Sequence, residues 1–375
     1  MCGEVPRTAC REAGTGIARS LLLAAMLTAA LGESSCRRTS PARSGESPPP
    51  SGTQVSGEAP APTVTGKLLR IALIAKSASN PAFLSAKTGA EDQAQELSAK
   101  LGLPIEITWM TPSQEDGRVQ AQRIHQAVNE RFDAILISCS NDARVVEAID
   151  DAVARGVAVM TFDSDAPTSR RFSYCGVDDE LIGRQVMIEL AQLLPNGAKI
   201  AVLAGNRESP ELRLRIRGFT KEAASHPGLK IVGVFSHAET AQDAAAELLR
   251  VSSAFPDVTG WAVLGGWALY TKSLLEELQP GSGKTRHRIV SVNALPPQLV
   301  YVERGVAPVL LAQPTYLWGA VGVQTIVDKL VLGKAVPALV PLDLVRVTAD
   351  NLGAWARQLR AWGFGDVPEE YLKLK

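Results

Sequence analysis

The chain has 375 residues, 46% of them hydrophobic and 21% charged, which is enough for a large core and more than one domain. Its 39 basic and 39 acidic residues give a formal net charge of zero. Nucleic-acid binding needs a basic footprint, and binding to a membrane surface needs a polybasic patch, so the composition favours neither class of partner.

The N-terminal segment has the pattern of a secretion signal. Arg7, Arg11 and Arg19 precede the apolar run Leu21–Leu31, which is shorter than the roughly 20 residues of a transmembrane helix. Residues 1–36 are therefore predicted to be a signal peptide. The segment resembles a bacterial lipoprotein signal in which Cys36 is lipidated. Because Glu33 departs from that pattern, secretion without an anchor stays open.

Residues 37–67 are rich in Pro, Ser, Gly and Thr and almost free of bulky apolar side chains. Such a segment cannot bury enough surface to fold, so it is predicted to be a disordered linker.

After Lys67 the pattern changes to short apolar runs that alternate with helical segments, and it does so twice along the chain. A helix is expected to begin at Asn80-Pro81, where Asn caps free N–H groups, and to end at Gly102. Two runs of βα units predict an α/β fold of two Rossmann-like lobes, each with a parallel sheet covered on both faces. The predicted strands are Leu69–Ala75, Ile105–Trp109, Asp133–Ser138, Val157–Phe162, Lys199–Leu203, Leu229–Phe235, Gly260–Leu264, Arg288–Asn293 and Val309–Leu311.

Polar side chains follow the predicted strands, where ligands bind in parallel sheets. Lys76–Phe83 follows the first strand, and Asp163, Asn293 and Gln313 follow later ones. Carboxylates and amides accept hydrogen bonds from a polyol, whereas amides and guanidinium groups donate them. An aromatic ring such as Phe83 can cover the C–H face of a sugar.

From Leu69 to about Val347 the chain resembles the ribose/galactose type of periplasmic binding proteins. The resemblance lies in Asn80-Pro81-Ala82-Phe83, in 161–167 (TFDSDAP) with 174–179 (YCGVDD) and Gly183, in Arg215-Ile216-Arg217-Gly218-Phe219, and in Gln313 with Gly319. It implies the type I fold, with an N-terminal lobe of 68–177 and 313–341 and a C-terminal lobe of 178–312 and 342–375. The ligand-binding residues that it implies, together with the strand ends, are Asn80, Phe83, Asp163, Asp165, Arg215, Asn293 and Gln313.

Each of these residues has an ordinary structural alternative. Asp163 and Asp165 could stabilise turns, and Asn80 could act only as a helix cap. Phe83 could pack in the core, Gln313 could satisfy backbone groups at a hinge, and Arg215 lies among solvated arginines.

The sequence also departs from the family pattern. Ala82 replaces a second aromatic residue, Leu264–Trp267 lacks an Asn-Asp pair, and Asn293 stands where an Asp is common. These changes leave the identity of the sugar open, and Trp267 or Trp318 could supply the missing aromatic wall.

No enzymatic chemistry is indicated. Residues 281–285 (GSGKT) lack the upstream glycine of a phosphate-binding loop, and neither a dinucleotide motif nor a nucleophile elbow is present. Without a CxxC or Cys/His cluster, neither a metal nor a cofactor is expected. Cys139 and Cys175 are expected to be buried thiols, and a disulfide between them stays open.

The expected function is that of a monomeric receptor in the periplasm or at the cell surface, which closes around a monosaccharide or similar polyol and delivers it to the permease of an ABC importer. The alternative is a sensor that docks on a chemoreceptor or histidine kinase. The related gene repressors carry an N-terminal DNA-binding unit, for which this sequence has a signal and a linker instead. The tail after Asp350 is amphipathic and is expected to pack against a lobe, with partner docking as the alternative.

Overall fold

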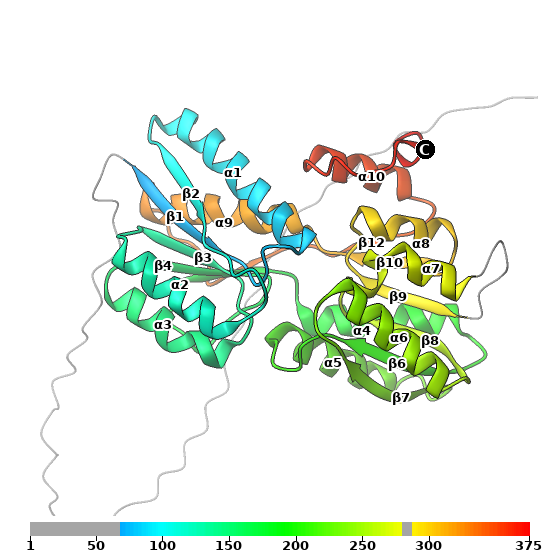
Figure 1. Cartoon of the computed structure of the whole chain (residues 1–375). Helices are drawn as coiled ribbons and strands as arrows, with labels where there is room; N and C mark the ends of the chain where they lie inside the picture. The colour runs from blue at the N-terminus through cyan, green and yellow to red at the C-terminus, as the bar shows by residue number, and fades with distance from the viewer. Residues whose placement is uncertain (1–67, 280–286) are drawn as a thin grey trace, which may run out of the picture. The chain divides into compact units, whose positions relative to one another are not determined.

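The computed structural model describes residues 68–279 and 287–375. The predicted signal peptide, Cys36, the linker 37–67 and the turn 281–285 lie outside the described residues. Figure 1 shows two α/β lobes, each built on one six-stranded sheet. The predicted fold class is confirmed.

The first sheet has the strand order β11-β5-β4-β3-β1-β2, and its paired strands run parallel. Its strands are β1 (Leu69–Ile74), β2 (Ile105–Trp109), β3 (Ala134–Ile137), β4 (Ala158–Phe162), β5 (Ser173–Gly176) and β11 (Leu339–Pro341). Its helices are α1 (Pro81–Leu101), α2 (Gly117–Asn129), α3 (Asp142–Ala154) and α9 (Thr315–Leu330).

The second sheet has the order β12-β10-β9-β8-β6-β7, and β12 pairs antiparallel to β10. Its strands are β6 (Ala198–Ala204), β7 (Leu229–Ser236), β8 (Val258–Val263), β9 (Arg288–Val292), β10 (Val309–Ala312) and β12 (Val345–Val347). Its helices are α4 (Asp179–Leu193), α5 (Pro210–Ala223), α6 (Ala241–Ala254), η1 (Trp267–Tyr270), α7 (Lys272–Leu278), η2 (Pro296–Gln298), α8 (Leu299–Glu303), α10 (Leu352–Ala361) and α11 (Glu369–Leu372).

The chain passes between the sheets after β5, again after β10, and once more between β11 and β12. The sequence reasoning did not predict β5, β11 or β12. The last two have only three residues each and are partly exposed, so they lack the long apolar run of a buried parallel strand.

Alternation along the central strands directs side chains to both faces of each sheet. Leu69, Ile71 and Leu73 of β1 pack with α1 and α9, whereas Ala72 and Ile74 pack with α2 and α3. Figure 1 shows α1 and α9 side by side over one face of the first sheet. Burial on both faces explains why these strands read as continuous apolar runs.

The C-terminal tail packs on the second lobe, as expected from its apolar face. Leu352, Trp355 and Leu359 of α10 are buried in the core of that lobe. Trp362 then stacks on Tyr316 of α9 with a ring-centroid distance of 5.8 Å. The tail therefore contacts elements of both lobes.

Candidate functional site

Two glycines set the position of Arg215, which lies on α5. A side chain on Gly183 of α4 would meet the Arg215 carbonyl oxygen at 1.9 Å, and one on Gly218 would meet the Glu180 carbonyl oxygen at 1.9 Å. Glycine therefore lets α4 and α5 approach closely. This explains physically why both glycines occur in the motifs quoted above.

The guanidinium of Arg215 is buried and makes directed contacts. Its Nε donates to Oδ1 of Asp179 at 2.8 Å, and its Nη1 donates to the Leu264 carbonyl oxygen at 2.9 Å. Asp179 is the first residue of α4. Burial raises the pKa of the Asp179 carboxyl to about 7, although the Arg215 charge acts in the opposite direction.

A chain of side-chain hydrogen bonds continues from Arg215 through two further predicted residues. Arg215 Nη2 donates to Gln313 Oε1 at 3.3 Å, and Gln313 Nε2 donates to Asn293 Oδ1 at 3.2 Å. Asn293 Nδ2 in turn donates to the Tyr270 hydroxyl at 3.2 Å. The structure therefore brings three of the seven predicted residues into one buried network, and Tyr270 is an addition that the sequence reasoning missed.

Asp163 follows β4 directly and is buried. Its Oδ2 accepts a hydrogen bond from the Ser138 hydroxyl at 2.9 Å, and its carbonyl oxygen accepts one from the Tyr174 hydroxyl at 2.9 Å. Burial raises the pKa of the Asp163 carboxyl to about 6, while the charges of Lys76 and Arg215 oppose this rise. The positive charge of Arg215 in the second lobe thus stabilises the ionised form of Asp163 in the first lobe.

Lys76 connects the two lobes beside this network. It follows the first strand, is 2% exposed, and its ammonium forms an ion pair with the Glu211 carboxylate of α5. Ser209 Oγ lies 3.5 Å from Lys76 Nζ, and Glu115 Oε1 lies 3.9 Å away. Burial opposes the charged form of Lys76, but the surrounding carboxylates more than offset it and hold its pKa well above the ordinary value.

Glu115 and Glu239 extend the acidic surroundings of Lys76. Glu115 Oε1 accepts hydrogen bonds from Asn206 Nδ2 at 3.2 Å and from Ser209 Oγ at 3.1 Å. Glu239 Oε1 accepts one from the Asn206 backbone N–H at 2.9 Å. Burial and the neighbouring Glu115 charge raise the pKa of the Glu239 carboxyl well above its usual range, despite the opposing Lys76 charge.

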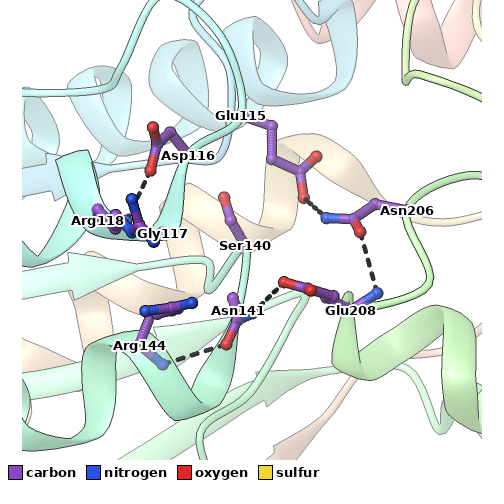
Figure 2. Close-up of a pocket in the computed structure, with 9 residues that line it drawn as sticks. All are labelled: Glu115, Asp116, Gly117, Arg118, Ser140, Asn141, Arg144, Asn206 and Glu208. Carbon is purple, nitrogen blue, oxygen red and sulfur yellow. Dashed lines mark hydrogen bonds between the residues drawn. The ribbon is translucent and has the colours of Figure 1, made fainter.

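A polar cavity of about 290 Å³ opens next to this cluster (Figure 2). Asn141 of the first lobe donates to Glu208 of the second across it at 2.6 Å. Figure 2 shows the Glu115 side chain reaching toward Asn206 at its upper edge. Since Glu115 also lies beside Lys76, the cavity adjoins the buried cluster. Its lining residues are Glu115, Asp116, Gly117, Arg118, Ser140, Asn141, Arg144, Asn206 and Glu208.

Asn80 and Phe83 occupy local structural positions. Asn80 Oδ1 accepts from the Ala82 N–H at 3.0 Å and so caps α1, as its sequence context predicts. The buried Phe83 ring lies 6.4 Å from Phe162 and 6.1 Å from Trp318. Trp318 is therefore part of the first lobe's core, as in the ordinary alternative, and does not form the aromatic wall of the site.

Asp165 is held by its own loop. Arg171 donates to both carboxylate oxygens, at 2.5 and 2.6 Å, and Thr161 donates to Oδ1 at 2.5 Å. The residue lines a separate cavity of about 760 Å³, together with Arg171 and Tyr174. With its oxygens already bonded, Asp165 fits the turn alternative.

Trp267 is partly buried and packs against the hydrophobic core of the second lobe. Its ring lies 5.5 Å from His237, which follows β7 two residues before Glu239. Trp267 Nε1 is buried and has no hydrogen-bond partner within the described residues.

The two cysteines of the folded part, Cys139 and Cys175, are free and buried. Burial raises the pKa of both thiols, as for small hydrophobic residues in a core. In the described ranges, no cluster of three or more His, Cys, Asp or Glu side chains could hold a metal ion. Over the same residues, no helix is both long and apolar enough to span a bilayer.

The sequence reasoning missed Lys76, Glu115, Glu211 and Asp179. Lys76 did carry a signal, because it is the first polar residue after a strand. Glu211 and Asp179 stand at the starts of helices, where acidic residues are common for dipole reasons alone, so the sequence did not distinguish them.

The family profile described as "Periplasmic binding protein domain" matches residues 71–335. Ribose import binding protein RbsB of Escherichia coli (strain K12) is 26% identical over 295 residues, covering 78% of this chain and 96% of that protein. The protein of the same name from Bacillus subtilis is 29% identical over 153 residues, covering 41% of this chain and 48% of that protein.

Solved structures share the fold. A solute-binding protein of an ABC transporter from Burkholderia graminis, in complex with D-arabinose, has a TM-score of 0.69 at 22% identity, covering 76% of this chain and 96% of its own. The glucose-galactose binding protein GanP of Geobacillus stearothermophilus has a TM-score of 0.67 at 23% identity, covering 75% of this chain and 97% of its own. With the profile spanning most of both lobes, the predicted resemblance is confirmed, and the chain belongs to the periplasmic binding protein family.

Proposed function

We propose that this chain is an extracytoplasmic solute-binding protein that closes its two lobes around one monosaccharide and passes it to an ABC importer. The observation that carries the proposal is that both lobes contribute buried polar side chains to one region of the protein. Asp163 comes from the first lobe, and Arg215 and Asn293 come from the second. Buried polar groups are retained where they are paired or functional, and this set is positioned by both lobes.

The chemistry of the network suits a polyol. Each sugar hydroxyl both donates and accepts, so the Asp163 carboxylate would accept, and the Arg215 guanidinium would donate. The amides of Asn293 and Gln313 can do both. Micromolar affinity corresponds to about 8 kcal/mol, and charged hydrogen bonds of about 1.5–3 kcal/mol each could supply it after ordering costs.

The names of the relatives support a sugar ligand. They include ribose import binding proteins, a D-ribose/D-allose-binding protein and a D-apiose import binding protein. The solved structures include complexes with D-arabinose and D-fucose. For Asn80, Phe83 and Asp165, a direct contact with the ligand stays a prediction.

A ligand that contacts both lobes would stabilise the arrangement in which they touch. Ion pairs and hydrogen bonds join the lobes through Lys76 with Glu211, Asn141 with Glu208, and Arg213 with Asp142. Binding would shift the equilibrium toward this closed state by a factor set by how much more tightly the ligand binds the closed state than the open one. The importer would then recognise the closed pair of lobes.

Thermal unfolding against a panel of monosaccharides tests the binding. A ligand at 100 times its Kd stabilises the native state by about 2.7 kcal/mol, which raises the Tm by several degrees. The near-isosteric variant Gln313→Leu should reduce the affinity found by calorimetry at least tenfold, whereas exposed Leu84→Ala should leave it unchanged. A panel that shifts no Tm, or a Gln313→Leu affinity equal to that of the native chain, contradicts the proposal.

Delivery and location are tested separately. Deleting the gene should abolish uptake of the radiolabelled ligand, and uptake that is unaffected would favour the sensor alternative.

Cys36→Ala should release the protein from the membrane fraction if Cys36 carries the lipid, and an unchanged distribution argues against the anchor.

A further inference from the structure

The C-terminal tail, residues 351–375, follows the part of the chain that the family profile matches. It is anchored in the second lobe, where Trp355 is 6% exposed and its Nε1 donates to the Ala294 carbonyl oxygen at 2.7 Å. Nearer the end of the tail, the Tyr371 hydroxyl donates to Glu303 Oε2 of α8 at 2.8 Å. The tail is therefore a fixed part of the second lobe.

Helices α1 and α9 of the first lobe form a rigid platform beside this tail. A Cβ atom on Gly89 of α1 would lie 2.0 Å from the Tyr316 carbonyl oxygen. One on Gly319 of α9 would lie 1.8 Å from the Ala86 carbonyl oxygen. Glycine at both positions lets the two helices pack in backbone contact. The Tyr316 hydroxyl also donates to Asp92 Oδ2 of α1 at 2.9 Å, so its ring is held where the helices meet.

The tail contacts this platform directly after α10. The Trp362 ring stacks on the Tyr316 ring, with 5.8 Å between the ring centroids and 2° between the ring planes. The next residue, Gly363, has a φ of 87°, and a Cβ atom there would lie 3.3 Å from Thr88 Cγ2 of α1. Phe364 packs against the hydrophobic cluster of the second lobe and against the one formed mainly by the first. Three consecutive tail residues therefore join the second lobe to the first.

These contacts form a continuous path from the buried polar network to the first lobe. Ala294, which directly follows Asn293, accepts the hydrogen bond from Trp355. The Trp355 ring meets the Trp362 ring edge-on, with 5.5 Å between the centroids and 89° between the planes. Trp362 then stacks on Tyr316. Because Trp362 and Tyr316 belong to different lobes, a rigid rotation of one lobe against the other displaces the two rings from their stack.

We propose that the tail is an interlobe strap: Trp362, Gly363 and Phe364 bind the first lobe, hold the two lobes in this arrangement and so raise the affinity for the ligand. Stacked aromatic rings stabilise the state in which they meet beyond the area that they bury. A contact present in one arrangement alone shifts the equilibrium toward it, and the apparent affinity rises with the fraction of binding-competent protein. The strap does not depend on which ligand binds, whereas its effect on affinity rests on the proposed function.

Double electron–electron resonance on the ligand-free full chain tests the strap. Spin labels are attached through p-acetylphenylalanine at the exposed positions Gln95 of α1 and Ala246 of α6, one in each lobe, which leaves the cysteines untouched. We expect one narrow distance distribution without further substitution, and a broader, displaced one in Trp362→Ala and in Tyr316→Ala. The double variant should be displaced no further than Trp362→Ala, because both changes remove the same contact. Single variants with an undisplaced distribution overturn the inference.

Two conservative variants serve as controls. Tyr371→Phe lies in the same tail and removes only its hydrogen bond to Glu303 within the second lobe, so the distance distribution should be retained. Tyr316→Phe keeps the stacked ring and should also retain it. A displacement in Tyr371→Phe as large as that in Trp362→Ala, or in Tyr316→Phe as large as that in Tyr316→Ala, contradicts a strap that acts through the stacked rings. Far-ultraviolet circular dichroism and Tm establish that each variant is folded.

Calorimetry with D-ribose, D-arabinose and D-galactose tests the effect on affinity. For a sugar that binds, Trp362→Ala and Tyr316→Ala should raise the Kd about three- to tenfold, and Tyr371→Phe should leave it unchanged. A displaced distance distribution with an unchanged Kd overturns the claim that the strap sets affinity and leaves the proposed function standing. If none of the sugars binds, the result counts against the proposed function, and the distance measurement still decides whether the strap exists.

Discussion

Asp163 and Asn293 hold corresponding positions in the two lobes, each directly after a central strand and each with a left-handed backbone. Asp163 follows β4 with a φ of 56°, and Asn293 follows β9 with a φ of 68°. Asp and Asn tolerate this region better than other non-glycine residues. After its left-handed turn, Asn293 bonds to Gln313 and Tyr270 in the buried polar network, whereas the buried Asp163 carboxylate accepts a hydrogen bond from Ser138.

The strain at Asn293 is measurable. Asn293→Ala and Asn293→Gly both remove the hydrogen bonds to Gln313 and Tyr270. Only the alanine variant has a Cβ atom, which makes a positive φ unfavourable. We expect the alanine variant to be less stable than the glycine variant by about 1–2 kcal/mol in urea unfolding. The same contrast at Asp163 is the replicate, and equal stabilities of the two variants at both sites would exclude strain.

The buried Asp163 carboxyl should make the stability of the ligand-free protein depend on pH. Burial raises its pKa to about 6, against about 3.9 in the unfolded chain. The folded protein therefore binds the proton more tightly, so this contribution to stability is fully present below about pH 4 and is lost as the pH rises through 6. The decrease in unfolding free energy approaches 3 kcal/mol for this group.

Asp163→Asn tests this pH dependence, because asparagine fits both the site and the left-handed backbone. In the native chain, this carboxyl should make the unfolding free energy fall by up to about 1.4 kcal/mol per pH unit between pH 4 and 7. In Asp163→Asn this contribution to the fall should be absent when the unfolding free energy is measured with urea at each pH. Exposed Asp366→Asn is the control and should retain the native slope. A native-like slope in Asp163→Asn would mean that the carboxyl titrates normally.

The close crossing of α4 and α5 at Gly183 should not tolerate a side chain. A Cβ atom would lie 1.9 Å from the Arg215 carbonyl oxygen and 2.7 Å from its carbon, both backbone atoms. Gly183→Ala must separate the helices, which we expect to lower the unfolding free energy by about 1–3 kcal/mol and to weaken ligand binding by displacing Arg215. Gly365→Ala, where no atom lies within 4 Å, should change neither quantity by a measurable amount.

Phe83 is expected to contribute mainly to the stability of the first lobe. Its ring packs against Phe162 and Trp318 in the core, so Phe83→Ala should lower the unfolding free energy by about 3–5 kcal/mol in chemical denaturation. Leu84→Ala, the neighbouring residue with 45% exposure, should cause a change within about 0.5 kcal/mol. A small loss in Phe83→Ala would indicate that the ring packs loosely and could serve a ligand instead.

Local patterns in the sequence were sufficient for most elements of the fold. The apolar runs of β1, β3 and β4 predicted buried strands, because parallel strands covered on both faces need apolar side chains at every position. Asn80 marked the start of α1 through its cap, and Gly102 marked its end through a left-handed φ of 63°. The short strands β11 and β12 were not predicted, because their own sequences carry little apolar signal. Their pairing partners are also distant in the sequence: β5 lies more than a hundred residues before β11, and β10 lies several tens of residues before β12.

The sequence by itself determined that there are two α/β lobes and that Asp163, Asn293 and Gln313 follow their strands, whereas Arg215 was chosen through the resemblance to the family. Only the tertiary structure decided that Lys76 reaches Glu211 of the other lobe, and that Asp165 is bonded within its own loop. Strand and helix patterns depend on neighbours a few residues apart, so they can be read along the chain. The charge balance around Lys76 depends on side chains that are far apart in the sequence, such as Lys76 and Glu211 at a separation of 135 positions, and they become neighbours only when both sheets are packed.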